Sequence, residues 1–393
     1  MLNQALFDRE VTRFIRKNQN KDIPSLILKG SPFENVTVQE LAIQIKGLQV
    51  AKKKFPEFYE TEAIIYPPKL NLEQTSSEIT ARYKASLING RRAIDLTGGM
   101  GIDSYYLSRN FKEFIYCELN EELAEIAAHN FDVLEANNIK VRSENGLEIL
   151  KNATEKFSWV YADPARRNEQ GGKVFKLEDC EPNIPASLEM IFQHTENVKL
   201  KTSPILDISA GLDELRNVKE IHIIAIRNEV KELLWILEKG YKDEPVIKTL
   251  NFEKSEIQKF SGKRSDDYDN IIFSEPEDYL YEPNAAVMKS GMFNTLATKT
   301  NTKKLNQNSH LYTSEELKIF PGRIFKITEI KLYKDSYLKK NFKNKKANLT
   351  TRNFPESVEN IRKRFKIKDG GEDYIFFTTN LQEEKIVIFC RKI

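Results

Sequence analysis

The spacing of apolar residues changes in character along the chain. Over residues 1–70 they recur with a helical period, most clearly between Val38 and Leu48, which predicts a mostly helical N-terminal segment. Thr75 and Glu78 have the spacing of a capping box and predict the start of a further helix. That helix is expected to bury one apolar face, formed by Ile79, Tyr83 and Leu87.

From Arg91 onward, short apolar runs alternate with helical segments. Seven runs have the length and composition of strands: residues 93–96, 114–117, 139–142, 158–162, 204–208, 221–226 and 246–252. Helices are expected between them, including one over 121–137 and one around Leu233-Leu234-Trp235. This alternation predicts an α/β fold, in which a mostly parallel, seven-stranded sheet is covered by helices on both faces. The polar stretch 261–267 predicts a boundary to a smaller C-terminal region.

The strongest chemical signal is the segment Asp95-Leu96-Thr97-Gly98-Gly99-Met100-Gly101-Ile102-Asp103. It lies where a strand ends and a helix begins, the usual ligand position in an open α/β sheet. Gly99, Gly101 and Ser104 also fall at the spacing of a dinucleotide-binding fingerprint. Asp95 and Asp103, however, suit a cationic ligand better than a pyrophosphate. S-adenosylmethionine carries an amino group and a sulfonium and no phosphate, so it is the cofactor we expect here.

The next two strand ends carry further candidates for cofactor binding. Glu118 closes the second strand, where a carboxylate accepts hydrogen bonds from ribose hydroxyls, although a solvated strand end has the same sequence. Asn145-Gly146 follows the third strand and would meet an adenine edge, or form an ordinary turn. The complete expected cofactor set is Asp95, Thr97, Gly98, Gly99, Gly101, Asp103, Glu118 and Asn145.

The fourth strand end, Asp163-Pro164-Ala165-Arg166-Arg167, is the expected reaction centre. A carboxylate at this point would hold an exocyclic amine beside the cofactor methyl, which is catalysis by positioning. We assign catalytic roles to Asp163, Pro164 and Arg166, and substrate phosphate binding to Arg167. The alternative for Arg166 is an ion pair with an acid of the protein body.

Other chemistries are poorly supported by the sequence. The four histidines, at positions 129, 194, 222 and 310, lack metal-ligand spacing, so no metal is expected. Cys117, Cys180 and Cys390 are odd in number and widely separated, which disfavours a disulfide framework. Cys180 remains a weak candidate nucleophile, because its acidic neighbours oppose thiolate formation. The N-terminus does not resemble a signal peptide and no run reaches the ~20 apolar residues of a membrane span, so a cytoplasmic location is expected.

The charge is distributed unevenly. The chain has 61 Lys and Arg against 58 Asp and Glu, a net charge of +3, yet residues 299–368 contain 19 basic and 6 acidic residues. This asymmetry indicates a polyanion-binding module, or a solvated Lys-rich face. Aromatic residues in the same region are expected to be mostly core. The cations expected to contact such a polyanion are Lys339, Lys340, Lys343, Lys345 and Lys346.

These features together resemble the class I S-adenosylmethionine-dependent methyltransferases, in the first motif at Asp95–Asp103, at Glu118 and at Asp163-Pro164. More specifically, the chain resembles bacterial methyltransferases with a C-terminal THUMP-like domain. The matching stretches include Tyr161-Ala162-Asp163-Pro164-Ala165-Arg166-Arg167, Leu206-Asp207-Ile208-Ser209, Tyr281-Glu282-Pro283-Asn284 and Arg352-Asn353-Phe354-Pro355. Because THUMP modules generally recognise RNA, the resemblance implies a tRNA or rRNA substrate.

The resemblance implies a Rossmann-like core with four divisions of the chain. They are a helical N-terminal segment (1–70), a methyltransferase domain (71–260), a small linking or ferredoxin-like domain (261–320) and an α+β THUMP-like domain (321–393). One departure matters, because amine methyltransferases usually follow Asp-Pro with proline and an aromatic residue that stacks on the target base. Ala165 and Arg166 occupy those places, so a catalytically inactive RNA adaptor that binds S-adenosylmethionine is the second hypothesis. A nucleotide-dependent oxidoreductase is the third.

Overall fold

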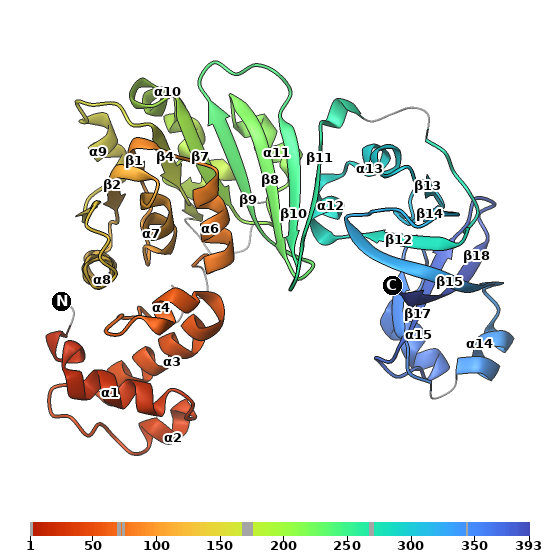
Figure 1. Cartoon of the computed structure of the whole chain (residues 1–393), viewed down its shortest axis with the longest axis horizontal. Helices are drawn as coiled ribbons and strands as arrows, with labels where there is room; N and C mark the ends of the chain where they lie inside the picture. Colours follow the sequence, from red (N-terminus) through yellow and green to blue (C-terminus); the bar gives the residue numbers. More distant parts are fainter. Residues whose placement is uncertain (1–2, 69–71, 73–74, 167–175, 267–270, 343–344) are drawn as a thin grey trace. The chain divides into compact units, whose positions relative to one another are not determined.

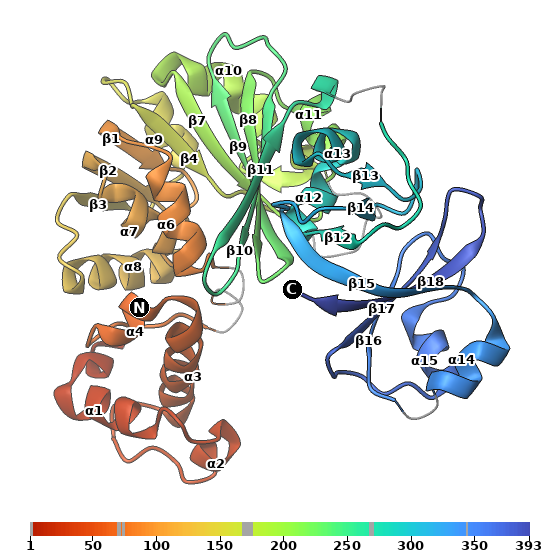
Figure 2. The same ribbon diagram turned by 45° about the vertical axis from the view of Figure 1, so that its right-hand side comes forward.

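The computed structural model describes residues 3–68, 72, 75–166, 176–266, 271–342 and 345–393. The chain forms two compact units, one of residues 1–219 with 234–243, the other of residues 220–233 with 244–393. The division passes through strand β9 (Glu229–Glu238). Figures 1 and 2 show the two units in sequence colours, red to green for the first and green to blue for the second.

The first unit begins with a short 3-10 helix (Gln4–Phe7). The α-helices that follow it, drawn in red to orange in Figure 1, are α1 (Arg9–Asn18), α2 (Ile23–Ile27), α3 (Val38–Lys54) and α4 (Pro56–Glu60). They share one hydrophobic core with the α/β part of the unit. Two buried side-chain amides bind the backbone of Ile65 and Tyr66, which follow α4. Gln44 hydrogen-bonds to the N–H and C=O of Tyr66, both at 2.9 Å, and Asn130 does the same for Ile65 at 2.9 and 2.8 Å. The N-terminal segment is therefore an integral part of this unit.

Five parallel strands form the sheet of the first unit, in the order β7-β4-β1-β2-β3. They are β1 (Gly90–Asp95), β2 (Phe111–Cys117), β3 (Ile139–Arg142), β4 (Trp159–Ala162) and β7 (Asn197–Thr202). The helices are α6 (Glu78–Ser86), α7 (Ile102–Ser108), α8 (Glu121–Val133), α9 (Gly146–Lys151), α10 (Ile184–His194) and α11 (Ile208–Glu214). Helix α6 contacts α7, and α9 contacts α10, so that helices cover both faces (Figure 2). A short pair, β5 (Ala165–Arg166) and β6 (Cys180–Glu181), follows β4.

The α/β fold class is confirmed, but the sheet has nine strands instead of seven. Its full order is β11-β10-β8-β9-β7-β4-β1-β2-β3. Strand β10 (Val246–Phe252) runs parallel to β8 (Val218–Ile226) and antiparallel to β11 (Ile257–Gly262).

Two predicted elements within the sheet region were wrong. The expected helix around Leu233 is strand β9, whose residues 232–236 are all buried and therefore show no period. The expected strand at 204–208 is a turn leading into α11, and the strand is β7 at 197–202. Lys199 and Lys201 made that stretch look solvent-exposed, although both side chains are buried.

The C-terminal part of the second unit is built on a seven-stranded sheet in the order β13-β14-β12-β15-β18-β17-β16. Its strands are β12 (Tyr279–Pro283), β13 (Lys303–Lys304), β14 (Tyr312–Ser314), β15 (Gly322–Leu332), β16 (Asn348–Thr351), β17 (Asp373–Thr379) and β18 (Lys385–Lys392). All pairings are antiparallel except β16 with β17. The helices are α12 (Ala285–Ser290), α13 (Phe293–Thr300), α14 (Asp335–Phe342) and α15 (Val358–Phe365).

Glu282 on β12 ties this sheet to a later loop. Its carboxylate is 5% exposed, accepts hydrogen bonds from Arg323 of β15 and accepts one from Arg352 at 3.0 Å. A buried carboxylate is stable only when it is paired in this way. Strand β12 of the segment 261–320 pairs with β15 of the segment 321–393, so the two segments contribute to one sheet. Their division into two domains stays a prediction.

Candidate functional site

The glycine loop after β1 is fixed by contacts that only glycine permits. Gly99 and Gly101 have φ values of +59° and +81°, which strongly favour glycine. A Cβ on Gly98 would lie 2.3 Å from the Tyr116 ring, and one on Gly101 would lie 2.5 Å from Phe131. A Cβ on Gly99, in contrast, would have only one neighbour within 4 Å, a backbone oxygen at 3.9 Å. Gly99 therefore faces open space at the end of the strand.

Asp95 organises the start of this loop. Its Oδ1 accepts hydrogen bonds from the Thr97 backbone N–H at 2.9 Å and the Thr97 hydroxyl at 3.2 Å, and its Oδ2 accepts one from Ser104 at 2.5 Å. Burial raises the pKa of Asp95 to about 7, although these hydrogen bonds oppose the rise and the nearby charge of Asp103 adds to it. The carboxyl thus titrates near neutral pH in the folded protein.

Glu118 closes β2 and reaches back to the loop. Its Oε2 accepts the Gly99 N–H and its Oε1 accepts the Asn120 N–H, both at 2.8 Å. Asn145 is exposed and caps α9, where its Oδ1 accepts the Leu147 N–H at 2.9 Å. Both residues lie at the carboxyl ends of neighbouring strands, beside the glycine loop.

Asp163 follows β4, the strand on the other side of β1. Its backbone N–H donates to the Thr97 hydroxyl at 2.7 Å, which links it to the glycine loop. Its Oδ2 forms an ion pair with Lys201 of β7, a residue that sequence reasoning missed. The Asp163 side chain is 36% exposed and that of Lys201 is 11% exposed, so the pair opens to solvent at the aspartate.

Asp103 is held by internal partners. Its side chain contacts Lys84 of α6 at 2.9 Å and accepts hydrogen bonds from the hydroxyls of Ser76 and Tyr161, both at 2.7 Å. Burial acts to raise the pKa of Asp103, but the charges of Lys84 and Lys201 outweigh it and keep the pKa below its usual value. Lys84 is fully buried and was also missed, because the sequence placed Ile79, 46% exposed here, on the buried face of that helix.

Only some of the residues predicted to contact the substrate lie within the described part of the structure. Arg166 lies on β5, but its side chain is outside the described residues, as are Arg167, Lys343 and the side chain of Lys340. Lys339, Lys345 and Lys346 are exposed. The ring of Tyr333 contacts the rings of Phe354 and Phe365 within a hydrophobic cluster of the second unit.

Three of the four histidines contact other residues of the protein, and all three cysteines are buried. His129 bonds the Ala63 carbonyl at 2.8 Å, His222 is buried against Glu220, and His310 stacks on Phe293. The three cysteines are buried, and none of them forms a disulfide bond. Among the described residues, no three His, Cys, Asp or Glu side chains are grouped as a metal site would require. No helix in the described part of the chain is long and apolar enough to cross a membrane.

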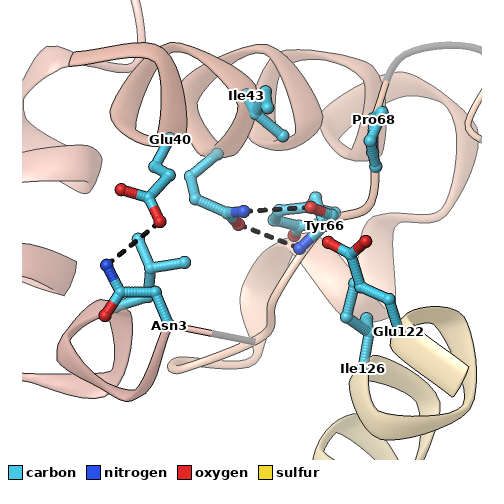
Figure 3. Close-up of a pocket in the computed structure, with 9 residues that line it drawn as sticks. Asn3, Glu40, Ile43, Tyr66, Pro68, Glu122 and Ile126 are labelled. Atoms are coloured by element: carbon cyan, nitrogen blue, oxygen red, sulfur yellow. Dashed lines mark hydrogen bonds between the residues drawn. The ribbon is translucent and has the colours of Figure 1, made fainter. Parts of the chain in front are cut away.

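A small pocket lies between the N-terminal segment and α8 (Figure 3). The Gln44–Tyr66 hydrogen bonds hold its wall, and Asn3 donates to Glu40 at 3.0 Å on one side. Its lining residues are Asn3, Leu6, Glu40, Ile43, Gln44, Tyr66, Pro68, Glu122 and Ile126. They include none of the strand-end candidates, so the pocket is separate from the site.

The strand order of the first unit and the glycine loop at the end of β1 define a Rossmann-like core of the methyltransferase type. Residues 279–321 match the family model of a ferredoxin-like domain, and residues 322–392 match that of a THUMP domain-like region. The crystal structure of a "putative methyltransferase" from Porphyromonas gingivalis W83 is 30% identical, with a TM-score of 0.89. The match covers 100% of this chain and 99% of that chain. The chain therefore belongs to this family of methyltransferases with a THUMP-like C-terminal domain.

Two other solved structures match more weakly. A "putative RNA methyltransferase" from Pyrococcus horikoshii is 16% identical over 48% of this chain and 98% of that chain, with a TM-score of 0.35. TrmK from M. capricolum, solved with S-adenosyl-homocysteine, is 19% identical over 42% and 70%, with a TM-score of 0.32. At these scores neither structure carries an argument about this chain. No curated protein matches it.

Proposed function

We propose that this protein transfers a methyl group from S-adenosylmethionine to a nucleotide of tRNA or rRNA. The observation that carries the proposal is the joint placement of three strand ends. The glycine loop after β1 is bonded to Glu118 at the end of β2 and, through Thr97, to Asp163 at the end of β4. Ligands bind at this edge of open α/β sheets, and the chain belongs to a methyltransferase family.

The residues present fit the proposed cofactor. Gly99 leaves room for close approach of a ligand to the backbone, since little else would occupy the volume of a Cβ there. Glu118 uses one acceptor site of each oxygen for a backbone N–H, and a carboxylate has about four such sites, so both ribose hydroxyls can also be bound. S-adenosylmethionine supplies an electrophilic methyl on a sulfonium, whose positive charge suits the ionised carboxylates around it.

Within this site, Asp163 is the residue that positions the methyl acceptor. Its backbone is fixed by Thr97 and one carboxylate oxygen by Lys201, while the side chain remains partly exposed. A carboxylate held on two sides restricts the approach of an acceptor to a narrow range of directions, which is the main contribution such a site makes to rate.

The proposed RNA contact is the exposed lysine group of Lys339, Lys345 and Lys346 on the second unit. Truncation at residue 299 would separate β12 from β15 and is therefore a poor test. Substitution of all three lysines by Gln in the full chain should lower RNA affinity and reduce the slope of log affinity against log salt by about 2 to 3. An equivalent triple substitution at the exposed Lys140, Lys156 and Lys176 serves as control. An unchanged salt slope in the first variant would contradict the assignment.

Calorimetry tests the cofactor. The protein should bind S-adenosylmethionine, and Glu118→Gln should weaken that binding about 10-fold to 100-fold, the effect of losing a hydrogen bond to a charged group. Glu125→Gln, on the adjoining helix α8, is a control of the same chemistry outside the loop contacts. Affinity for NAD without affinity for S-adenosylmethionine would favour the oxidoreductase hypothesis.

Tritiated methyl transfer to bulk cellular RNA tests the reaction. Wild-type protein should label RNA, and Asp163→Asn should reduce the rate at least 100-fold while S-adenosylmethionine still binds. Asp132→Asn changes an exposed aspartate of α8 and should leave the rate unchanged. Cofactor and RNA binding without any transfer would identify the inactive adaptor.

A further inference from the structure

Helix α1 carries a row of basic residues on its exposed side. Arg9, Arg13 and Lys17 are spaced four residues apart and are all exposed, and the exposed Lys21 continues this spacing beyond the end of the helix. Residues four apart lie on the same side of a helix, about 6 Å from one another along its axis. These four residues form the basic stripe of the N-terminal segment.

The basic stripe is not neutralised by acids of the protein. Among the described residues, none of its four cations takes part in an ion pair. Two acids of the same segment, Asp8 and Asp22, instead accept backbone N–H groups at the starts of α1 and α2. In helix α15 of the second unit, by contrast, Arg362, Lys363 and Arg364 each pair with an acid. Because like charges four residues apart destabilise a helix, the uncompensated stripe indicates an anionic partner.

A cavity of about 220 Å³ lies at the end of the stripe, between α1 and α2 (Figure 1). Lys21 of the stripe and Lys29 both line it, together with the half-buried ring of Phe14. Asn18, which is 3% exposed, also lines the cavity; its Nδ2 donates to the Phe14 carbonyl at 2.7 Å, and its Oδ1 accepts no hydrogen bond from the described residues. A Cβ on Gly30, another lining residue, would have no neighbour within 4 Å. The cavity thus offers cations, an aromatic ring and a buried acceptor.

This combination fits one unpaired nucleotide. The ammonium groups of Lys21 and Lys29 suit a phosphate, and the ring of Phe14 provides an apolar surface for a base. The free oxygen of Asn18 can accept a hydrogen bond from an N–H on the edge of that base. The cavity is smaller than the ~300–1,000 Å³ of pockets that enclose whole drug-sized ligands, so it suits a single ring system.

An anionic lipid surface is the other usual partner of a basic helix, but the arrangement of α1 disfavours it. Such a helix inserts its apolar face into the membrane interface. The apolar residues Val11 and Ile15 of α1 are buried in the core of the first unit and are not available for this. Ile27 and Leu28 are exposed at the end of α2, but two side chains are much less than the apolar face of an anchoring helix.

We propose that the basic stripe and the cavity form a binding surface for single-stranded RNA, an inference that rests on the proposed RNA methyltransferase function. The stripe contacts successive phosphates of the strand, and the cavity takes one unstacked base. The N-terminal segment shares its hydrophobic core with strands of the first unit, so RNA held on this surface keeps a fixed position relative to the strand ends. None of the lysines proposed to bind RNA on the second unit belongs to this surface.

The first test removes three charges of the stripe. Substitution of Arg13, Lys17 and Lys21 by Gln in the full chain should lower affinity for a fluorescently labelled single-stranded RNA at least 10-fold at low salt. The slope of log affinity against log salt should fall by about 2, or about 0.7 for each lost phosphate contact. Unfolding in urea should be unchanged or shifted to higher urea, because the substitution also relieves repulsion along α1.

The control for this variant makes the same change in net charge elsewhere on the first unit. Lys112, Lys140 and Lys156 are exposed near the amino-terminal ends of β2, β3 and β4, and their joint substitution by Gln should leave the salt slope as it is. A stripe variant that is folded and keeps the wild-type slope would overturn the inference.

The second test fills the cavity. Ser25 is exposed and lines it, so Ser25→Leu should exclude a base and lower affinity for single-stranded RNA about 5-fold to 100-fold, the effect of losing one stacked base. Affinity for duplex RNA, whose bases are paired, should not change. Ser86→Leu, at an exposed serine of α6, is the control. An unchanged affinity of Ser25→Leu for single strands would show that the cavity holds no base.

Two further measurements separate the possible failures. If wild-type protein labels RNA with tritiated methyl but the stripe variant binds RNA as tightly as wild type, this inference is wrong and the proposed methyltransferase function stands. If wild-type protein neither binds nor labels RNA, both are wrong. Binding of wild-type protein to vesicles of phosphatidylserine and phosphatidylcholine, lost in the stripe variant without any loss of RNA binding, would assign the stripe to a lipid surface instead.

Discussion

Replacement of Asp95 by Asn should make the first unit more stable at alkaline pH than the wild-type protein. Asp95 is 1% exposed and is bonded to Thr97 and Ser104. Asn has the same shape, its Oδ1 accepts from Thr97, and its Nδ2 donates to the Ser104 oxygen. The substitution therefore mimics the protonated acid and removes only the ability to ionise.

The magnitude follows from the pKa of Asp95, which burial raises from 3.8 to about 7. Because the pKa is higher in the folded state, the folded protein binds a proton that the unfolded chain has released. Stability is thus lost as pH rises from about 4 to 7, and the full loss is present above pH 7. A difference of about 3 pH units corresponds to about 4 kcal/mol at pH 8, and to less than half of that at pH 5.

Urea denaturation followed by tryptophan fluorescence measures this effect. Both tryptophans, Trp159 and Trp235, belong to the first unit, so their emission reports its unfolding. Asp95→Asn should raise the free energy of unfolding much more at pH 8 than at pH 5, while Asp132→Asn, at an exposed site, should change neither. An equal gain at the two pH values would refute the reasoning, since it would show that ionisation of Asp95 carries no cost.

Four further substitutions test the packing of the glycine loop and the buried ion pairs. Gly101→Ala should destabilise the first unit by about 2 to 4 kcal/mol, because the new Cβ would lie 2.5 Å from the Phe131 ring and residue 101 has a left-handed backbone conformation. Gly99→Ala should cost only about 1 kcal/mol, the strain of the left-handed conformation alone, and should mainly weaken cofactor binding in calorimetry. Lys84→Met removes the ion-pair partner of the buried Asp103 and leaves only the charge of Lys201 acting on it. The substitution should cost about 3 to 5 kcal/mol by urea denaturation, and less as pH falls and Asp103 is protonated. Glu282→Gln should lower the melting temperature measured by circular dichroism, because it removes the negative charge that pairs with Arg323 and Arg352.

The strand ends that carry the proposed cofactor site were predictable because each combines a short apolar run with a turn. The run before Asp95, the run before Glu118 and the run before Asp163 all became parallel strands. The backbone conformation of the glycine loop was also predictable, because consecutive glycines after a strand indicate positive φ angles. Here local sequence and tertiary structure agree, which is the condition under which patterns are reliable.

Lys201 and Lys84 could not be found in the same way. Lys201 forms an ion pair with Asp163, and Lys84 forms one with Asp103. Both partners lie outside the element that carries the lysine, and the spacing of apolar residues gives no information about such pairs. A signal for β7 did exist, because Val198, Leu200 and Thr202 alternate with the two lysines, as in a strand of period two. The alternation was outweighed by the more apolar segment at 204–208.

The buried charges of the first unit argue for a ligand at the strand ends. Lys84, Lys201 and Asp103 are largely withdrawn from water, and Asp95 is buried with a pKa near 7, an arrangement that lowers stability at neutral pH. In the second unit, Glu282 is buried between two arginines that hold strands together, which is a structural use of charge. Asp95, in contrast, accepts hydrogen bonds from the nearby Thr97 and Ser104, so linking distant strands does not explain why its carboxyl group is buried. A cation bound near it would favour its ionised form and recover the lost free energy, as expected if the strand ends bind a sulfonium cofactor.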